Sequence, residues 1–390
     1  MQSNHLKSQF LLRNDIIYLN FGGYGACPKP VFERYQQYQL ELEQEPVRFM
    51  TVNGLEYLKQ SREALGTFLN CHADDVVYVT NPSYAANIIA KNFPLKQGDE
   101  ILTTNLEYGA CDRTWNYYCQ KKGARYVRQK IKFPLQSKED FIEQFFNGLT
   151  PATKLVFISH ITSSTGLRLP VEEICSIAKQ KGLFTFVDGA HAPGQILLNL
   201  NMLQADFYTG ACHKWMLTPK GSSFLYVKKE LQNMLDPLVI SWGYNSAKPS
   251  HSQFLDYHQM QGTRDFSAFL TIPVAIDFMK ENNWATVAEH CRTITQTNAD
   301  RFCDLLKAEP LCYSKDDFIF QLCSTLIKTK QPEQLHNLLF DKYKIQIPVM
   351  VHEDKIFLRY SIQAFNTQED LNILYRALED IIQTTDLIEL

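Results

Sequence analysis

An aspartate and a lysine at the ends of two strand-like segments carry the clearest chemistry in this sequence. Asp188 ends an apolar run within FVDGAH (Phe186 to His191). In open α/β sheets, ligands bind outside the carboxyl ends of the strands, so an aspartate there faces the ligand crevice. Lys214 follows the strand-like segment ADFYTG and lies in a mostly uncharged stretch. A partly desolvated lysine has a lowered pKa and a nucleophilic amine.

Together these two side chains match the needs of pyridoxal phosphate (PLP). This cofactor requires a lysine amine for its Schiff base and a carboxylate that keeps its pyridine nitrogen protonated. An opposite charge nearby stabilises the pyridinium. Alone, Asp188 would more often be a turn or capping residue, and Lys214 a loop lysine with its charge in water. The pair therefore predicts a PLP enzyme with its cofactor on Lys214.

The motifs around this pair resemble, in their order, the class V aminotransferase family of fold-type I PLP enzymes. The likeness covers nearly the whole chain and is strongest for the isopenicillin N epimerase-like branch. It depends on YLNFGGYGACPKPV, EPVRF, EYGA, HITSSTG, DGAH, HKW, QGTRDFSAFL and LRYSIQAFNT. Asp-x-x-His alone is a weak signal, whereas the ordered set is specific.

The resemblance implies roles around the cofactor. It implies that Asn81, Ser83 and Tyr84 open a helix whose N-terminus holds the phosphate, as suits an anion. Alone, this turn would be an ordinary helix cap, and Tyr108 would more often be a core residue. The other implied cofactor contacts are Tyr108 stacked on the ring, Ser163 and His191 near the phenolic oxygen, and His213 at the phosphate end.

The resemblance also implies a partner subunit and a substrate site. Gly262 and Thr263 match a segment that reaches the phosphate from the other subunit, which implies a homodimer with shared active sites. Arg359 matches the arginine that binds the substrate α-carboxylate, a task that suits a bidentate guanidinium. Asn20 matches an N-terminal position near the substrate. The catalytic residues implied are Lys214, Asp188 and His191, and no spacing reads as a metal site.

Two positions depart from the family pattern. Ala211 stands where many members have a serine, so that one phosphate hydrogen bond is missing or is supplied by Thr209. Cysteine desulfurases carry a mobile catalytic cysteine shortly before the equivalent of Arg359, but Tyr343 to Leu358 contains none. The nearest upstream thiol is Cys323, which argues against persulfide chemistry.

The elements that must position these residues alternate between strand and helix from about residue 31 to residue 227. Predicted helices include Ser83 to Asn92, capped by Ser83, and Pro170 to Lys181. Apolar, β-branched strands alternating with helices predict a mostly parallel seven-stranded sheet covered on both faces. The predicted strands are Val76 to Thr80, Glu100 to Thr104, Arg125 to Lys130, Lys154 to His160, Leu183 to Val187, Ala205 to Thr209 and Ser222 to Val227.

After about residue 255 the pattern changes to longer helices and then a smaller α+β unit. We predict an N-terminal arm (1–30), a large PLP-binding domain (31–255) and a small C-terminal domain (256–390) joined to the arm. The C-terminal elements predicted are helices Ser267 to Lys280, Trp284 to Lys307 and Gln368 to Ile382, with strands Phe318 to Thr325 and Ile356 to Ser361.

Composition limits the function classes further. The 390 residues are 45% hydrophobic and 21% charged, with a net charge of -3 and no basic tract, which disfavours nucleic acid or an anionic membrane as a partner. The 10 cysteines form no C-x-x-C pair and predict reduced thiols in the cytoplasm. No apolar run approaches a membrane span. The signatures of dinucleotide-binding, P-loop, nucleophile-elbow and zinc-peptidase proteins are absent.

The sequence therefore predicts a PLP enzyme acting at the Cα of an amino acid or amino-acid-derived metabolite. Lys214 is the expected base at Cα. Epimerisation, C–S or β-elimination and transamination all remain open, and family likeness favours an epimerase or a β-lyase. The alternatives are an aminotransferase of the same family and a non-catalytic PLP-fold binding protein. A nucleotide-binding dehydrogenase is disfavoured by the missing glycine fingerprint.

Overall fold

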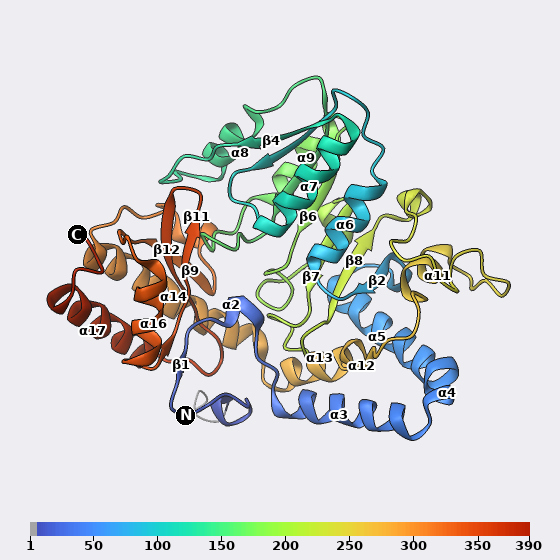
Figure 1. Cartoon of the computed structure of the whole chain (residues 1–390), viewed down its shortest axis with the longest axis horizontal. Coiled ribbons are helices and arrows are strands. Elements are labelled where there is room, and N and C mark those ends of the chain that lie inside the picture. The colour runs from blue at the N-terminus through green and yellow to red at the C-terminus, as the bar shows by residue number, and fades with distance from the viewer. Residues whose placement is uncertain (1–5) are drawn as a thin grey trace.

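A mostly parallel sheet of seven strands forms the larger part of the protein (Figure 1). The computed structural model describes residues 6–390. Only β8 runs against its neighbours, and the predicted number of strands and their mostly parallel arrangement are confirmed. The order across the sheet is β2 (Val76–Val79), β8 (Ser223–Val227), β7 (Phe207–Ala211), β6 (Phe184–Asp188), β5 (Thr153–Ser159), β3 (Glu100–Thr104) and β4 (Arg125–Gln129).

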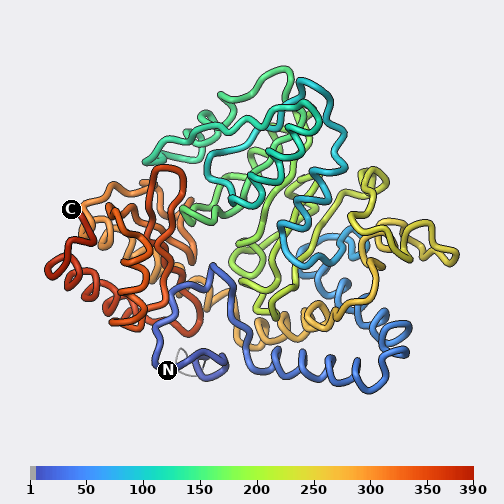
Figure 2. The backbone as a smooth tube through the Cα atoms, in the orientation of Figure 1, coloured from blue at the N-terminus to red at the C-terminus, as the bar shows by residue number. Residues whose placement is uncertain are grey.

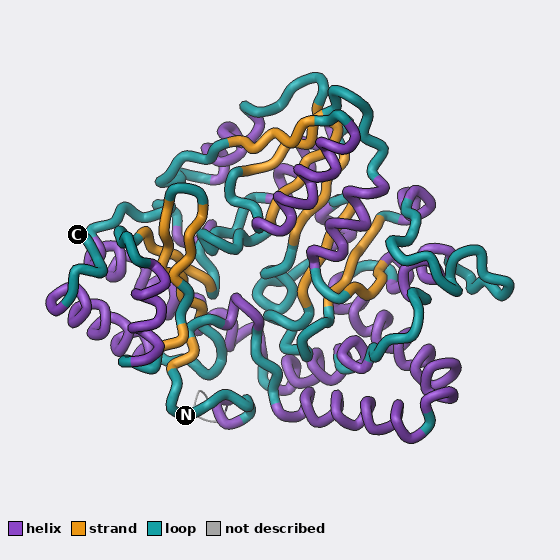
Figure 3. The backbone as a smooth tube through the Cα atoms, in the orientation of Figure 1, coloured by secondary structure: helices purple, strands orange, loops and turns teal. Residues whose placement is uncertain are grey.

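Helices cover the central strands of this sheet on each side (Figure 3), and the strands are therefore apolar on both faces. Alternate side chains of a strand point to opposite faces. Phe157 of β5 packs with Trp115 of α7 (Gly109–Lys122), whereas the adjacent Val156 belongs to the cluster that contains Ile174 of α9 (Val171–Gln180). The sheet is thus fixed between two separate apolar layers.

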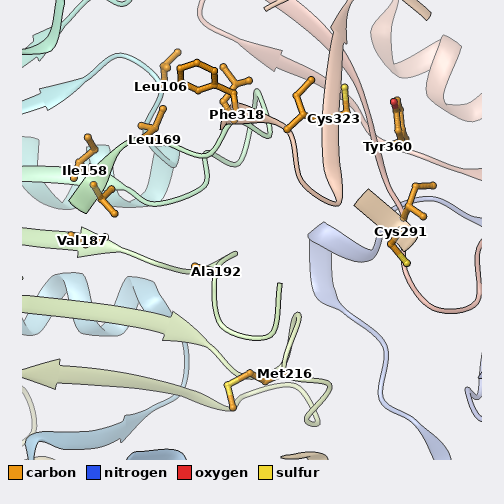
Figure 4. Packing of buried hydrophobic residues seen from close by; sticks show 14 of the residues in the cluster. Leu106, Ile158, Leu169, Val187, Ala192, Met216, Cys291, Phe318, Cys323 and Tyr360 are labelled. Carbon is orange, nitrogen blue, oxygen red and sulfur yellow. The ribbon is translucent and has the colours of Figure 1, made fainter. Parts of the chain in front are cut away.

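A second sheet lies in the C-terminal part of the chain. Its strands are antiparallel, in the order β11 (Val349–His352), β12 (Lys355–Ser361) and β9 (Leu322–Leu326). Figure 4 shows that Cys323 and Tyr360 of this sheet lie across from Ile158 and Val187 of the large sheet, with which they share one core cluster. The helices of this part are α14 (Trp284–Leu306), α16 (Pro332–Asp341) and α17 (Gln368–Thr384).

The N-terminal segment runs alongside the C-terminal part of the chain (Figure 2). Strand β1 (Ile17–Tyr18) pairs in parallel with β10 (Ile345–Gln346), and Asn20 forms a bridge with Ser361. Residues 1–5 of the predicted arm lie outside the described residues, and the three domain boundaries stay predictions. Within 6–390, none of the helices combines the length and the apolar character needed to cross a membrane.

Several predicted boundaries were wrong for local reasons. Helix α6 (Pro82–Asn92) is capped by Asn81, whose Oδ1 accepts the Tyr84 N–H at 2.9 Å, and not by Ser83. The strand predicted from Phe318 begins only at Leu322, because Lys315–Phe318 forms the short helix α15.

The helix predicted from Ser267 to Lys280 is divided into α12 (Ser267–Leu270) and α13 (Ile272–Glu281). Pro273 lies in the first turn of α13, and proline has no N–H to continue the hydrogen bonds of the preceding helix. β11 was not predicted, because the strand is too short to show a pattern of apolar residues.

Core packing around β5 gives a direct test of this architecture. Replacing Phe157 by Ala is expected to lower the free energy of unfolding by about 3–5 kcal/mol. The ring is fully buried, with centroids 5.8 Å from Trp115 and 5.3 Å from Phe186. Leu197→Ala is the matched control, since Leu197 is 98% exposed, and it should change stability by less than about 0.5 kcal/mol. Urea denaturation of both variants measures the difference, and equal losses would contradict the packing.

Candidate active site

The predicted chemical residues gather at the carboxyl edge of the large sheet. β6 ends at Asp188, and its parallel neighbour β7 pairs Thr209 with Asp188 before leading to His213 and Lys214. Parallel strands end at one edge, so the two segments that sequence analysis singled out are brought side by side.

The imidazole ring of His191 links the Lys214 amine to the Trp215 indole. Lys214 Nζ lies 3.1 Å from His191 Nε2, and Trp215 Nε1 donates to His191 Nδ1 at 3.3 Å. An indole N–H only donates, so Nδ1 carries no proton and the proton of the neutral ring is on Nε2. Burial, with the charges of Lys214 and Arg359, holds the pKa of His191 well below its usual value. His191 therefore donates toward Lys214, which favours an amine with a free lone pair.

The charge state of Lys214 is set by desolvation. Burial and then the charge of Arg359 lower its pKa to about 8, although Asp188 and Cys111 act in the opposite direction. At neutral pH an appreciable fraction of the amine is therefore unprotonated, as a nucleophile or base requires.

Asp188 is buried and has two hydrogen-bond partners. Its Oδ1 accepts the Ala190 N–H at 3.0 Å, and its Oδ2 accepts the Cys111 thiol at 3.5 Å. Burial raises the pKa of Asp188, and the Ala190 hydrogen bond and the Lys214 charge oppose that rise. The carboxylate has no ion-pair partner within 4 Å in the described chain, so a bound cation would relieve its desolvation.

Sequence reasoning assigned no role to two buried residues beside this centre, Cys111 and Glu107. Cys111 lies on α7, three residues after Tyr108, and this helical spacing was the one available signal. Glu107 is buried near Asp188, where it accepts from Thr104 Oγ1 at 2.7 Å and from Ser159 Oγ at 2.5 Å. Burial raises the pKa of Glu107 to about 8, so that the carboxyl is mostly neutral at neutral pH.

Arg359 joins three segments that are distant in sequence. Its Nη1 donates to Ser163 O at 2.5 Å and lies 3.4 Å from Ser163 Oγ, while its Nη2 donates to Asn20 Oδ1 at 3.2 Å. Its Nε has no partner within residues 6–390. Burial lowers the pKa of Arg359 to about 10, and its hydrogen-bond partners are uncharged. A buried guanidinium with only neutral partners is suited to bind an anion.

The backbone of the N-terminal arm packs closely against this centre at two glycines. A Cβ at Gly22 would lie 3.6 Å from His191 Cε1 and 3.7 Å from Arg359 Nη2. Gly25 has a φ of +66°, and a Cβ there would lie 2.2 Å from His213 O. The short helix α2 (Phe21–Tyr24) therefore lies directly against the lysine and arginine, as close backbone approach requires.

Some of the groups predicted to bind the cofactor phosphate already have hydrogen-bond partners within the protein. The Tyr84 N–H is occupied by Asn81, and His213 Nδ1 lies 2.9 Å from Ser222 O. Thr209 Oγ1 donates to Phe224 O at 2.8 Å, so it does not replace the hydroxyl that Ala211 lacks. Within residues 6–390, neither the N–H nor the hydroxyl of Ser83 has a hydrogen-bond partner.

The two remaining predicted residues are on the surface. Tyr108, the N-cap of α7, is half exposed beside the Asp188 region, and Thr263 is exposed in the loop after Gln261. Gln261 Oε1 accepts the Tyr84 hydroxyl at 3.1 Å, which brings that loop against α6.

Known proteins with similar sequences cover the same span. Residues 17–374 match the family model described as aminotransferase class-V. Isopenicillin N epimerase from Amycolatopsis lactamdurans is 30% identical over 96% of this chain and 97% of its own length. A probable chloroplastic L-cysteine desulfhydrase from Arabidopsis thaliana is 25% identical over 98% of this chain and 86% of its own length.

A solved structure has the same fold. C-DES, in a form with glycine covalently linked to its PLP cofactor, superposes with a TM-score of 0.82 at 20% identity. The match covers 96% of this chain and 99% of the other chain. At this identity the likeness concerns the fold.

The pKa of Lys214 gives a reactivity test. Pulses of formaldehyde with cyanoborohydride should methylate Lys214 at a rate that levels off above pH about 8, because its amine is neutral above its pKa. Lys330, whose pKa is raised by its hydrogen bond to Glu389, should keep gaining reactivity at higher pH. Peptide mass spectrometry measures both rates in one sample. Parallel pH profiles for the two lysines would contradict the desolvation of Lys214.

Proposed function

We propose that this chain, which belongs to the aminotransferase class-V family, binds its cofactor through Lys214 and acts at the Cα of an amino acid or amino-acid-derived substrate. The cofactor is pyridoxal phosphate. One observation carries the proposal. A partly neutral lysine amine meets a buried carboxylate and a buried guanidinium at one sheet edge, and neither of these two charges has an ion-pair partner within residues 6–390.

The residues present fit this cofactor. When bound, PLP supplies a protonated ring that withdraws electrons from the substrate Cα. Asp188 holds the proton on the pyridine nitrogen, and this cation in turn compensates the buried carboxylate. When the substrate amine replaces Lys214 on the cofactor, the released Nζ would be free to take the Cα proton, and His191, fixed by Trp215, would orient that amine.

Arg359 is the proposed site for the substrate α-carboxylate. A guanidinium that is buried among neutral oxygens gains most from an anion, and its planar fork matches a carboxylate. Asn20 and Ser163 hold its orientation through both Nη atoms. The substrate amine and Cα would then lie between Arg359 and Lys214.

We propose an epimerase or a C–S/β-lyase, with transamination by an aminotransferase-type mechanism as the alternative. The relatives named epimerase and L-cysteine desulfhydrase support these reactions. A persulfide-forming desulfurase is disfavoured, because eight of the ten thiols are buried and Cys71 and Cys303 are partly buried. Burial raises the pKa of Cys323, the thiol nearest in sequence before Tyr343 to Leu358, to about 12.

We further propose a homodimer in the cytoplasm. The loop with Gly262 and Thr263 is exposed, and exposed apolar side chains also occur close together in sequence at Val239, Ile240 and Trp242. Grouped exposed apolar side chains are typical of a protein–protein interface. The ten free thiols support a reducing compartment.

The visible absorption spectrum tests the cofactor lysine. The full-length protein with PLP should absorb near about 420 nm, the band of lysine-bound PLP. Lys214→Ala should abolish or shift this band, whereas Lys220→Ala, six residues further on, should retain it. A colourless wild-type protein that stays colourless with added PLP would overturn the proposal and favour a non-catalytic binding protein.

Exchange of the Cα proton tests the reaction. In D₂O, amino acids that perturb the visible band should take up deuterium at Cα, and Lys214→Ala should not support this uptake. Sulfide released from L-cysteine would identify a β-lyase, and inversion at Cα without loss of a substituent would identify an epimerase. Mass spectrometry and chiral chromatography measure these products. No uptake in any band-perturbing amino acid would exclude the shared Cα step.

A further inference from the structure

The turn between β11 and β12 reaches from the small sheet to the ends of β3 and β4. It consists of Glu353 and Asp354, which follow the last paired residues of the two strands. Asn105 Nδ2 donates to Glu353 Oε2 at 3.0 Å, and Arg128 Nη2 donates to Glu353 Oε1 at 2.8 Å. Asn105 directly follows β3, and Arg128 lies on β4. One carboxylate therefore joins the hairpin to two neighbouring strands of the large sheet.

The histidine before Glu353 makes a second contact with the same loop. His352 Nε2 lies 2.7 Å from the backbone oxygen of Asn105, which only accepts, so this nitrogen carries a proton. Asn105 is fixed by other bonds, because its N–H donates to Gln129 O at 3.0 Å and its Oδ1 accepts the Ile131 N–H at 2.9 Å. The tip of the hairpin therefore binds a residue that is held firmly in the large sheet.

The backbone of Glu353 adopts a conformation that glutamate rarely has. Its φ is +53°, in the left-handed region, which glycine, asparagine and aspartate adopt more readily. Such a conformation persists when the surrounding structure holds it, and it often marks a functional position. The contacts that a glutamate adds at this turn are those with Asn105 and Arg128, which a glycine would not make.

The partners of Glu353 on the large sheet are held independently of the hairpin. Arg128 Nη2 lies 3.4 Å from Asp112 Oδ2, and the Tyr126 hydroxyl donates to Asp112 Oδ1 at 2.7 Å. The side chains of Arg128 and Glu353 are each 35% exposed, so an isolated pair of this kind would be weak. Here the pair is part of a network with fixed members, which gives it more weight than a lone surface pair has.

Both sides of this contact lead to the proposed active site. From the turn, β12 continues to Arg359, the proposed carboxylate-binding residue. On the other side, Asn105 is followed three residues later by Tyr108, and Asp112 lies in the first turn of α7. β11 is an edge strand with partly exposed side chains, so packing holds it less firmly than the central strands. The position of the hairpin therefore depends on the contacts of its tip.

We propose that Glu353 is a positioning residue, whose bonds to Asn105 and Arg128 anchor the β11–β12 hairpin to the large sheet and hold Arg359 in place for the substrate carboxylate. The part of this proposal that concerns the substrate rests on the proposed function. Loss of the anchor lets β12 shift relative to the cofactor side of the site. It should therefore weaken the binding of an amino acid more than the binding of PLP.

Amide hydrogen exchange of the full-length chain measures the anchor without any cofactor. Glu353→Asn keeps a residue that tolerates the left-handed conformation but has a shorter side chain. Residues 349–358 should exchange at least about threefold faster in Glu353→Asn, and peptides of α17 should be unaffected. Arg128→Gln should act in the same direction, and the double variant should exchange no faster than Glu353→Asn alone, because both changes remove one interaction.

Arg128→Lys should restore most of the protection, because it keeps the positive charge. The matched control is Glu389→Gln, which removes a carboxylate that binds Lys330 at 2.9 Å in another part of the surface. Residues 349–358 should exchange in this control as they do in the wild type.

The concentration dependence of Cα deuterium uptake measures the consequence for the substrate. The common L-amino acids are offered to the PLP-loaded wild type in D₂O, and the one that exchanges fastest is used with the variants. Glu353→Asn should raise its half-saturating concentration at least about fivefold and change the maximal rate less than about twofold. The dissociation constant of PLP, from visible absorption, should change less than about twofold.

Unchanged exchange of residues 349–358 in Glu353→Asn would overturn the anchor. Faster exchange with an unchanged half-saturating concentration would overturn the positioning of Arg359. An equal loss of PLP affinity would also overturn it, since that result indicates a general structural role. A wild type that exchanges no Cα proton with any of these amino acids would overturn the proposed function and with it the role of Arg359, whereas the hydrogen-exchange result would still decide the anchor.

Discussion

Desolvation at the carboxyl edge of the large sheet is the constraint on which the rest of the site depends. It lowers the pKa of Lys214 to about 8, holds His191 neutral and raises the pKa of Asp188. Each of these pKa shifts changes the charge state that the side chain would have in water, and such shifts are typical of groups in functional sites. The same burial would destabilise the fold if these groups were scattered. Here they are near one another, and under the proposed function a cationic ring nitrogen and an anionic substrate would compensate them together.

The orientation of Arg359, the proposed substrate-binding residue, depends on the N-terminal arm. Arg359 comes from β12, Ser163 from the loop after β5, and Asn20 from the arm, 339 residues before Arg359. The arm is fixed there by backbone contacts, since the Gly22 N–H donates to Ser361 Oγ at 3.1 Å and Ser361 Oγ donates to Leu19 O at 3.0 Å. The guanidinium is thus oriented only when all three segments are folded together.

The sequence was sufficient for the parts that depend on local pattern. Apolar runs and strand ends predicted the parallel sheet and the meeting of Asp188 with Lys214, and motif likeness led to Arg359 with Asn20. The Asn-Pro pair before Ser83 was a usable signal for the start of α6, because proline favours the first helical position.

Contacts between distant side chains could not be read in the same way. Cys111 reaches Asp188 across 77 residues, and the occupied Tyr84 N–H and Thr209 hydroxyl are visible only in three dimensions. The sequence also gives no sign that Trp215 fixes the tautomer of His191, because that bond depends on how two turns pack.

The unpaired charges of the site are complementary to the ligand that the proposed function implies. Within the described residues, Arg359 has no carboxylate partner and Asp188 has no cationic partner. PLP with an amino acid has a protonated ring nitrogen and a carboxylate, so each of these two buried charges would gain an opposite charge on binding. Under the proposed function, this complementarity accounts for both uncompensated charges, because the free protein carries the cost of separated charges that binding removes.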